Sequence, residues 1–172
     1  ELQWLFGKGA YTSLSLYLKD ISGTPNEWSV YMGATGHGGT VYDTGARVTD
    51  NAWEHVAVTY DVTDGVKYYL NGAVTTPPLA GASSTSAAVT DNAVAMAWGG
   101  KLTAGSGVET VNNTFFTGQM DDIRYWDGVR TAGEINANKK VALRGDEDGL
   151  IGYWRLDSNF TDSAGLGSGD NV

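Results

Sequence analysis

The sequence predicts an all-β fold, namely a two-sheet antiparallel β-sandwich of the jelly-roll type with one short helix near residues 132–142. Short apolar runs with a period of two residues recur along the chain, and turn-forming Gly, Asn and Asp residues separate them. The chain also contains 24 Gly, 9 Tyr and 6 Trp but only 3 Pro, a composition that suits short strands and tight turns. Because 172 residues can bury a sizeable core, we expect one folded sandwich rather than a disordered tract.

The first strands follow from the alternation of apolar and polar residues. The three leucines of YTSLSLYL (11–18) fall on one face, because successive side chains of a strand point to opposite sides. WSVYMGA (28–34) is predicted as the return strand. Glycine turns then surround a short strand near residues 40–43.

The run WEHVAVTY (53–60) is predicted as a strand inside a packed sheet. Val56 and Val58 fall on one side of the ribbon, whereas Trp53 and His55 fall on the other. Both sides are largely apolar or aromatic, which is typical of a strand covered on both faces.

Two turns connect this run to the next strands. DVTDG supplies Asp and Gly, after which VKYYL resumes with β-branched and aromatic side chains. Asn71-Gly72 can adopt positive φ at low cost, which a type I′ turn requires. We therefore expect AVTT to fold back on VKYYL, so that the region forms three antiparallel strands.

The second half continues the same pattern. VAMAWGG (94–100) and FFTGQMDDIRYW (115–126) are predicted strands, with Gly118 at a bulge or bend. The small, polar segments 77–91 and 101–113 are predicted surface loops.

One helix is expected in RTAGEINANKKVAL. Thr131 and Glu134 have the spacing of a capping box, in which each side chain satisfies backbone donors at the start of a helix. Ile135 is then expected to face inward, and Lys139 and Lys140 lie where cations favour the helix dipole.

Charge and composition exclude several classes of function. The net charge is −9 and Lys and Arg are not clustered, so the attraction to phosphate that nucleic-acid binding needs is missing. No apolar run approaches the ~20 residues of a membrane helix, so we expect no membrane insertion. The absence of cysteine excludes disulfides and thiolate metal sites.

Several segments, taken in order, resemble the laminin-G-like, concanavalin A-like jelly-roll domains, a group that includes the pentraxins. The resemblance spans most of residues 5–135. It implies a β-sandwich, extracellular location, binding of glycans or proteins, and frequently a calcium ion. The matching segments are W-x-H-V-A-V-T-Y-D (53–61), Y-L-N-G (69–72), F-x-G-x-M-D-D-I-R-Y-W (116–126) and the helix start at 131–135.

The two ends of the chain depart from the family's pattern. Such domains open with a motif like the GLIGYWRLD of residues 149–157, followed by D-S-x-G as at 162–165, but here both stand at the end. The start, ELQWLFGKG, resembles the family's second or third strand. We therefore expect a jelly-roll domain over 1–145, with 146–172 a linker plus a strand that belongs to a neighbouring module or completes this sandwich, since sheets rarely leave an edge uncovered.

Asp121 is the acidic residue with the most specific expectation. In QMDDIRYW it shares parity with Ile123 and Tyr125, so it is predicted to point inward, where a carboxylate needs a cation or hydrogen-bond donors. The family resemblance implies that Asp121 is a calcium ligand. The alternative is an ion pair with Arg124 or Arg130, or hydrogen bonds to loop amides, and the sequence leaves both open.

The remaining candidates are less specific. His55 is expected to be structural, and with His37 it makes no zinc site of recognisable spacing. The acidic run 146–148 is expected to be a solvated linker rather than a metal site. No ligand-binding residue can be assigned, although Trp28, Trp98 and Trp126 could line a sugar site with loops 33–40 and 100–113 as its rim.

No catalytic residues emerge, so we expect no enzyme activity. Glycoside hydrolases need two carboxylates flanking the bond, whereas Asp121 and Asp122 alternate faces. Gly-x-Ser-x-Gly and phosphate-loop motifs are also missing. The expected function is therefore an extracellular recognition or adhesion module, on a cell or virion surface, that binds glycans or surface proteins. The alternative is a structural spacer or decoration unit that packs against neighbouring copies of the same module.

Overall fold

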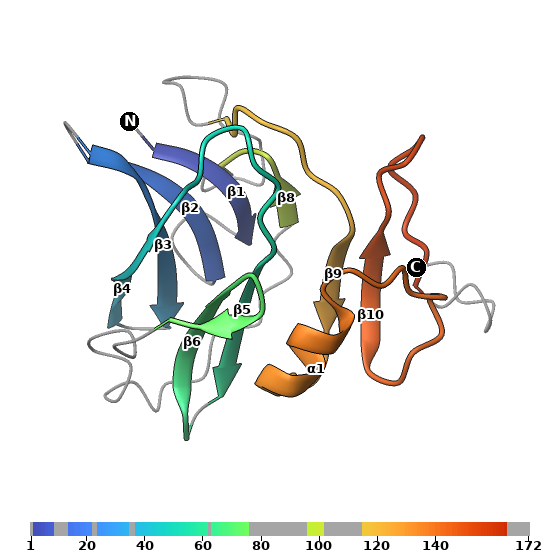
Figure 1. Cartoon of the computed structure of the whole chain (residues 1–172). Helices are drawn as coiled ribbons and strands as arrows, with labels where there is room; N and C mark the ends of the chain where they lie inside the picture. The colour runs from blue at the N-terminus through green and yellow to red at the C-terminus, as the bar shows by residue number, and fades with distance from the viewer. Residues whose placement is uncertain are drawn as a thin grey trace. The chain divides into compact units, whose positions relative to one another are not determined.

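The computed structural model describes residues 2–8, 14–21, 24–34, 37–61, 63–75, 96–101 and 115–164. The chain divides into two compact units, an N-terminal unit of Glu1–Thr117 and a C-terminal unit of Gly118–Val172. Strands predominate and one short helix interrupts them (Figure 1). The all-β prediction is therefore confirmed. The predicted loop 77–91 lies outside the described residues, and so does the predicted loop 101–113 except for Lys101.

The larger sheet of the N-terminal unit is antiparallel and has the strand order β4-β3-β2-β1-β8. Its first four strands follow one another in space as they do in sequence, as the blue and cyan arrows of Figure 1 show. The strands are β1 (Leu2–Lys8), β2 (Leu14–Ile21), β3 (Thr24–Ala34), β4 (His37–Arg47) and β8 (Met96–Trp98).

Strand β1 lies inside this sheet, and residues distant in sequence complete its environment. The backbone N–H of Gly99 donates to the carbonyl of Leu5 at 2.8 Å. The N–H of Thr117 donates to Gln3 Oε1 at 2.9 Å. Phe115 forms a parallel bridge with Trp4. The last described segment of the unit is thus tied to its first strand.

The side chains of β2 alternate as the sequence predicts. Leu16 and Leu18 are buried on one face, in the main core of the unit. Tyr17 is buried on the opposite face, where its ring stacks on Trp4 with ring centroids 5.1 Å apart. The sheet is therefore packed on both faces at this point.

The smaller sheet contains β5 (Val56–Asp61), β6 (Gly65–Leu70) and β7 (Ala73–Val74), in that order. Asn71 and Gly72 have φ values of 53° and 84°, so the type I′ turn predicted between β6 and β7 is confirmed. In the turn between β5 and β6, Asp61 Oδ1 accepts hydrogen bonds from the N–H groups of Thr63 and Asp64 at 2.7 and 3.1 Å.

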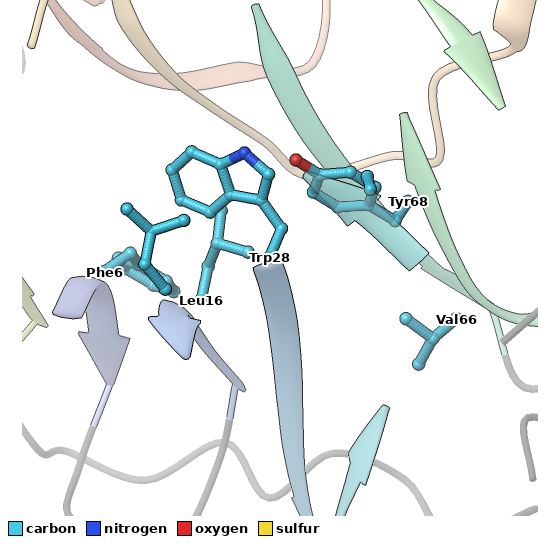
Figure 2. Close-up of a cluster of buried hydrophobic side chains, with 7 residues drawn as sticks. Phe6, Leu16, Trp28, Val66 and Tyr68 are labelled. Atoms are coloured by element: carbon cyan, nitrogen blue, oxygen red, sulfur yellow. The ribbon is translucent and has the colours of Figure 1, made fainter. Parts of the chain in front are cut away.

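One hydrophobic core joins the two sheets of this unit. Val66 and Tyr68 of β6 lie in the same cluster as side chains of the larger sheet, among them Phe6 and Trp28 (Figure 2). Face-to-face packing of two antiparallel sheets defines a β-sandwich. The predicted fold class is confirmed, and the cluster consists of Phe6, Leu16, Leu18, Trp28, Ala46, Val66 and Tyr68.

Two strand predictions need correction. The strand predicted over 53–60 begins only at Val56, and in the described part of the chain β5 pairs with β6 alone and lies at the edge of its sheet. The short strand predicted near 40–43 extends over eleven residues, because β4 pairs with β3 from His37 to Arg47. Gly38, Gly39 and Gly45, which were predicted to make turns, lie within the strand instead.

The C-terminal unit contains β9 (Ile123–Trp126), α1 (Ala132–Asn138) and β10 (Leu150–Trp154). The capping box at the start of α1 is confirmed, because Glu134 N donates to Thr131 Oγ1 and Thr131 N donates to Glu134 Oε2. Ile135 is buried as predicted. Among the described residues, no helix is long and apolar enough to cross a membrane.

Helix α1 is shorter than the predicted 132–142 and ends at Asn138. The guanidinium of Arg124 explains this end, since it donates to the carbonyls of Asn138 and Val141 at 2.8 and 2.5 Å. In a longer helix, these carbonyls would instead accept hydrogen bonds from backbone N–H groups of the next turn. The strand predicted over 115–126 is likewise shorter, and β9 begins at Ile123.

Strand β10, which carries the displaced opening motif, pairs antiparallel with β9 of the same chain. Gly152 is required here, because a Cβ atom would lie 2.6 Å from the Trp154 ring. Asp162, which begins the D-S-x-G segment, accepts hydrogen bonds from Tyr153 N and Ala164 N, both at 2.8 Å. The segment after β10 therefore folds back along this strand.

We expect deletion of residues 149–172 to lower the melting temperature and to increase self-association. The deletion removes β10 and exposes the edge of β9, and it also removes Leu150 and Tyr153 from the cluster that they form with Leu143. Calorimetry and size-exclusion chromatography would measure both effects. An unchanged melting temperature and oligomeric state would contradict this prediction.

The capping box also predicts an acid-dependent stability. Hydrogen bonds from Thr131 hold the pKa of Glu134 below its ordinary value of 4.5. A lowered folded-state pKa stabilises the protein above pH 4.5, and this stabilisation is lost as the pH falls through the folded-state pKa. The difference in unfolding free energy between wild type and Glu134→Gln should therefore shrink in acid. Chemical denaturation at several pH values tests this, and a pH-independent difference would disprove it.

Thr131→Ala supplies the matching control. It removes the hydroxyl that caps Glu134 N, at a cost of about 1 kcal/mol. In that background, Glu134→Gln should show a weaker pH dependence, because the hydroxyl donor to Glu134 is gone.

Candidate functional site

The most exposed tryptophan among the described residues is Trp53, whose side chain is 66% exposed. It lies in the segment that precedes β5 in the N-terminal unit. Trp4 and Trp28 of the same unit are buried in the sandwich. A large flat aromatic ring turned toward water is a surface that can bind a ligand, because contact with a ligand removes its apolar area from solvent.

The backbone around Trp53 is held by hydrogen bonds on both sides. Thr49, which precedes Trp53, donates its backbone N–H to Glu54 Oε1 at 3.2 Å. After Trp53, His55 N donates to Asn71 Oδ1 at 3.0 Å, and Asn71 N donates to the His55 carbonyl at 2.7 Å. The segment is thereby clamped to the turn between β6 and β7, so Trp53 stands on ordered backbone.

Exposed polar residues lie close to Trp53 along the chain and in the turn that holds it. Asp50 and Asn51 lie three and two residues before Trp53, and Asn71 lies in the turn to which the segment is clamped. Carboxylate and amide groups bind hydroxyls, and an indole face binds the apolar face of a sugar ring. We call Thr49, Asp50, Asn51, Trp53 and Asn71 the Trp53 surface.

The sequence missed Trp53 because a period-two pattern placed it in the strand. Asn51 has a φ of 58°, in the left-handed region, so the chain turns there and enters β5 only at Val56. The sequence does contain a signal for this turn, namely Asp50-Asn51, because Asp and Asn are common in turns.

The tryptophans proposed from the sequence lie elsewhere. Trp28 is 4% exposed and belongs to the sandwich core. Trp98 is half-buried and packs on Phe6 with ring centroids 4.5 Å apart. Trp126, in the C-terminal unit, is half-buried with the guanidinium of Arg130 at 4.3 Å from its ring centroid.

The segments proposed as a rim are only partly described by the structure. Residues 33–34 and 37–40 belong to β3 and β4 rather than to a loop. The second rim segment, 100–113, lies almost wholly outside the described residues. His55 is half-buried and contributes its backbone to the clamp on Asn71, whereas His37 opens β4.

The inward orientation predicted for Asp121 is wrong. Asp121 is exposed, and its Oδ1 accepts a hydrogen bond from the N–H of Asp122 at 3.0 Å. Asp122 has a φ of 53°, which breaks the strand alternation just before β9. The described residues contain no group of three or more His, Asp or Glu side chains arranged for a metal. Calcium binding at Asp121 stays a prediction.

Asp122 takes the inward position instead and completes a hydrogen-bonded cluster. Its Oδ1 accepts from the hydroxyl of Tyr153 at 2.6 Å, and its Oδ2 lies 3.2 Å from Arg124 Nη2. The Tyr153 hydroxyl in turn accepts from Leu143 N at 3.2 Å. The ion pair with Arg124 considered for Asp121 is thus made by its neighbour.

Tyr153 is the centre of this cluster and is fully buried. The guanidinium carbons of Arg124 and Arg155 lie 5.6 and 5.4 Å from its ring centroid. Burial and the hydrogen bond to Asp122 raise the pKa of Tyr153, against the opposing effect of Leu143 N–H. The phenol therefore stays neutral and donates to Asp122, which gives the cluster a structural role.

The acidic run 146–148 forms part of a turn that leads into β10. Glu147 accepts hydrogen bonds from Arg144 N and Gly145 N at 2.8 and 2.9 Å. Burial raises the pKa of Glu147, but these backbone donors outweigh it and leave the pKa lowered. Asp146 pairs with the exposed Arg144. The carboxylate of Glu147 thus closes its own turn.

A comparison with curated proteins finds no match. A solved structure of an S-layer domain-containing protein from Clostridium thermocellum is similar to this chain with 22% identity and a TM-score of 0.41. The alignment covers 81% of this chain and 63% of that chain, so this chain spans less than two thirds of the solved one.

The comparison with family models matches a long, continuous part of the chain. The model of the laminin G type described as "Concanavalin A-like lectin/glucanases superfamily" matches residues 3–136. This range includes both sheets of the N-terminal sandwich, strand β9 and the start of helix α1. The chain therefore belongs to the laminin G branch of the concanavalin A-like lectin/glucanases superfamily.

Proposed function

We propose that this chain is a non-catalytic recognition module of a cell or virion surface, and that it binds glycans at the Trp53 surface. The observation that carries the proposal is the 66% exposure of Trp53 on a segment clamped by Asn71. Membership of a lectin-like superfamily supports a binding role at an extracellular surface. A preformed aromatic face loses little conformational entropy when a ligand binds.

The charge of the chain favours a neutral glycan as the ligand. The net charge is −9, and the Trp53 surface itself carries the carboxylate of Asp50. Sulfated or uronic-acid-rich glycans would be repelled, because like charges raise the free energy of binding. A neutral sugar needs only the stacking face and the polar groups beside it.

The positions of the acidic side chains support a role without catalysis. Retaining glycoside hydrolases place two carboxylates at about 5–5.5 Å on either side of the scissile bond. Asp122 is engaged by Tyr153 and Arg124, while its neighbour Asp121 is exposed. The pair therefore does not present two carboxylates to one ligand.

Binding to a glycan array at millimolar calcium tests the proposal. We expect neutral glycans to bind wild type, and Trp53→Ala to weaken that binding about tenfold, equivalent to ~1.4 kcal/mol. Phe160→Ala is the matched control, because Phe160 is an aromatic residue that is 88% exposed in the C-terminal unit. Equal loss in both variants would contradict a site at Trp53.

The same experiment separates the alternative function. Silence of wild type across the array, together with self-association in solution, would favour a structural spacer or decoration unit of a surface assembly. Size-exclusion chromatography of the same sample provides the second readout.

Calcium binding is a separate part of the proposal, with Asp121 as its ligand. Extracellular modules bind calcium at about 10⁻⁴–10⁻³ M, so the site would fill only where calcium is abundant. We expect heat on calorimetric titration of wild type with calcium and none for Asp121→Ala. Asp148→Ala, which removes another exposed carboxylate of the same unit, should leave the titration unchanged. No heat in wild type would exclude calcium.

A further inference from the structure

Two polar groups are buried together between the sheets of the N-terminal unit. The indole Nε1 of Trp28 and the hydroxyl of Tyr68 are inaccessible to solvent, and neither makes a hydrogen bond to any described part of the protein. The two side chains are 4% and 0% exposed. A buried donor without a partner costs folding free energy, so such groups are normally satisfied by protein or by ordered water.

The two groups are neighbours and face the same space. Their ring centroids are 6.5 Å apart with an interplanar angle of 33°. Figure 2 shows the indole nitrogen of Trp28 and the hydroxyl oxygen of Tyr68 directed toward each other at one side of the core. They belong to β3 and β6, so this space lies where the two sheets meet.

The chemistry of the two groups suits one bridging water. An indole N–H can only donate, whereas a neutral phenol can both donate and accept. Burial, and then the charge of Glu54, raise the pKa of Tyr68 and keep the phenol neutral.

We propose that Trp28 Nε1 and the Tyr68 hydroxyl hold a single internal water molecule between the two sheets. The water accepts from the indole N–H and exchanges a second hydrogen bond with the phenol. It joins β3 to β6 through a polar link inside an otherwise apolar core, as buried waters do when they meet two to four polar groups.

Water–protein nuclear Overhauser measurements at the Trp28 indole proton provide the test. Wild type should show a cross-peak to water with the sign of a long-lived complex, and Tyr68→Phe should lose it. Val66→Ala is the matched control, because it removes buried methyl groups from the same strand and cluster without touching the polar pair, and should keep the cross-peak. Absence of the cross-peak in wild type would overturn the proposal.

Stability measurements give a second readout. With the water bound, Tyr68→Phe removes one of its partners and should lower the folding equilibrium constant about tenfold. In a dry core the same substitution removes an unsatisfied hydroxyl, so an unchanged or higher folding constant would overturn the proposal. A double-mutant cycle with Trp28→Phe should show coupling between the two side chains, and strictly additive effects would count against a shared water.

Discussion

The sandwich of the N-terminal unit depends on the contact between β3 and β6, where Trp28 meets Tyr68. Each aromatic side chain buries roughly 150–250 Å² of surface. Burying one large apolar side chain contributes about 1.5–3 kcal/mol, which is a large fraction of the about 5–15 kcal/mol by which a whole domain is stable. Trp28 and Tyr68 supply this contribution from opposite sheets, and the other residues of the core pack around them.

The position of the Trp53 surface follows from this packing. Once β6 is fixed by Tyr68, the Asn71-Gly72 turn at its end is fixed as well. Asn71 then holds the backbone on the C-terminal side of Trp53 through His55. The exposed indole is thus connected to the core by a short, hydrogen-bonded path, and a variant that loosens β6 would also disorder the proposed site.

Features that depend on neighbouring residues were predictable from the sequence. The leucine face of β2, the turn at Asn71-Gly72 and the capping box of α1 each need only a few consecutive side chains, and all three are present. The end of α1 was not predictable, because it is set by Arg124 from another strand.

The errors in the candidate site both come from strands that begin later than predicted. Residue 53 precedes β5, which starts only at Val56, and Asp122 adopts a positive φ just before β9, which breaks the alternation used to orient Asp121. A period-two pattern assumes an unbroken strand, so it assigned Trp53 to the interior and gave Asp121 the place that Asp122 occupies. Asn and Asp adopt positive φ more readily than most residues. A pattern of alternating side chains does not take this backbone preference into account.

The hydrogen bond between Thr117 and Gln3 has a consequence for how the protein is made. During synthesis β1 emerges well before the strand and segment that cover its second edge, because β8 and residues 115–117 lie near the end of the unit. Until then the ribosome carries a partly formed sheet with an open side, to which a second nascent chain could add a strand. Sheet closure that depends on residues distant in sequence is slow. We therefore expect the chain to aggregate more readily during synthesis on crowded polysomes than during refolding in dilute solution.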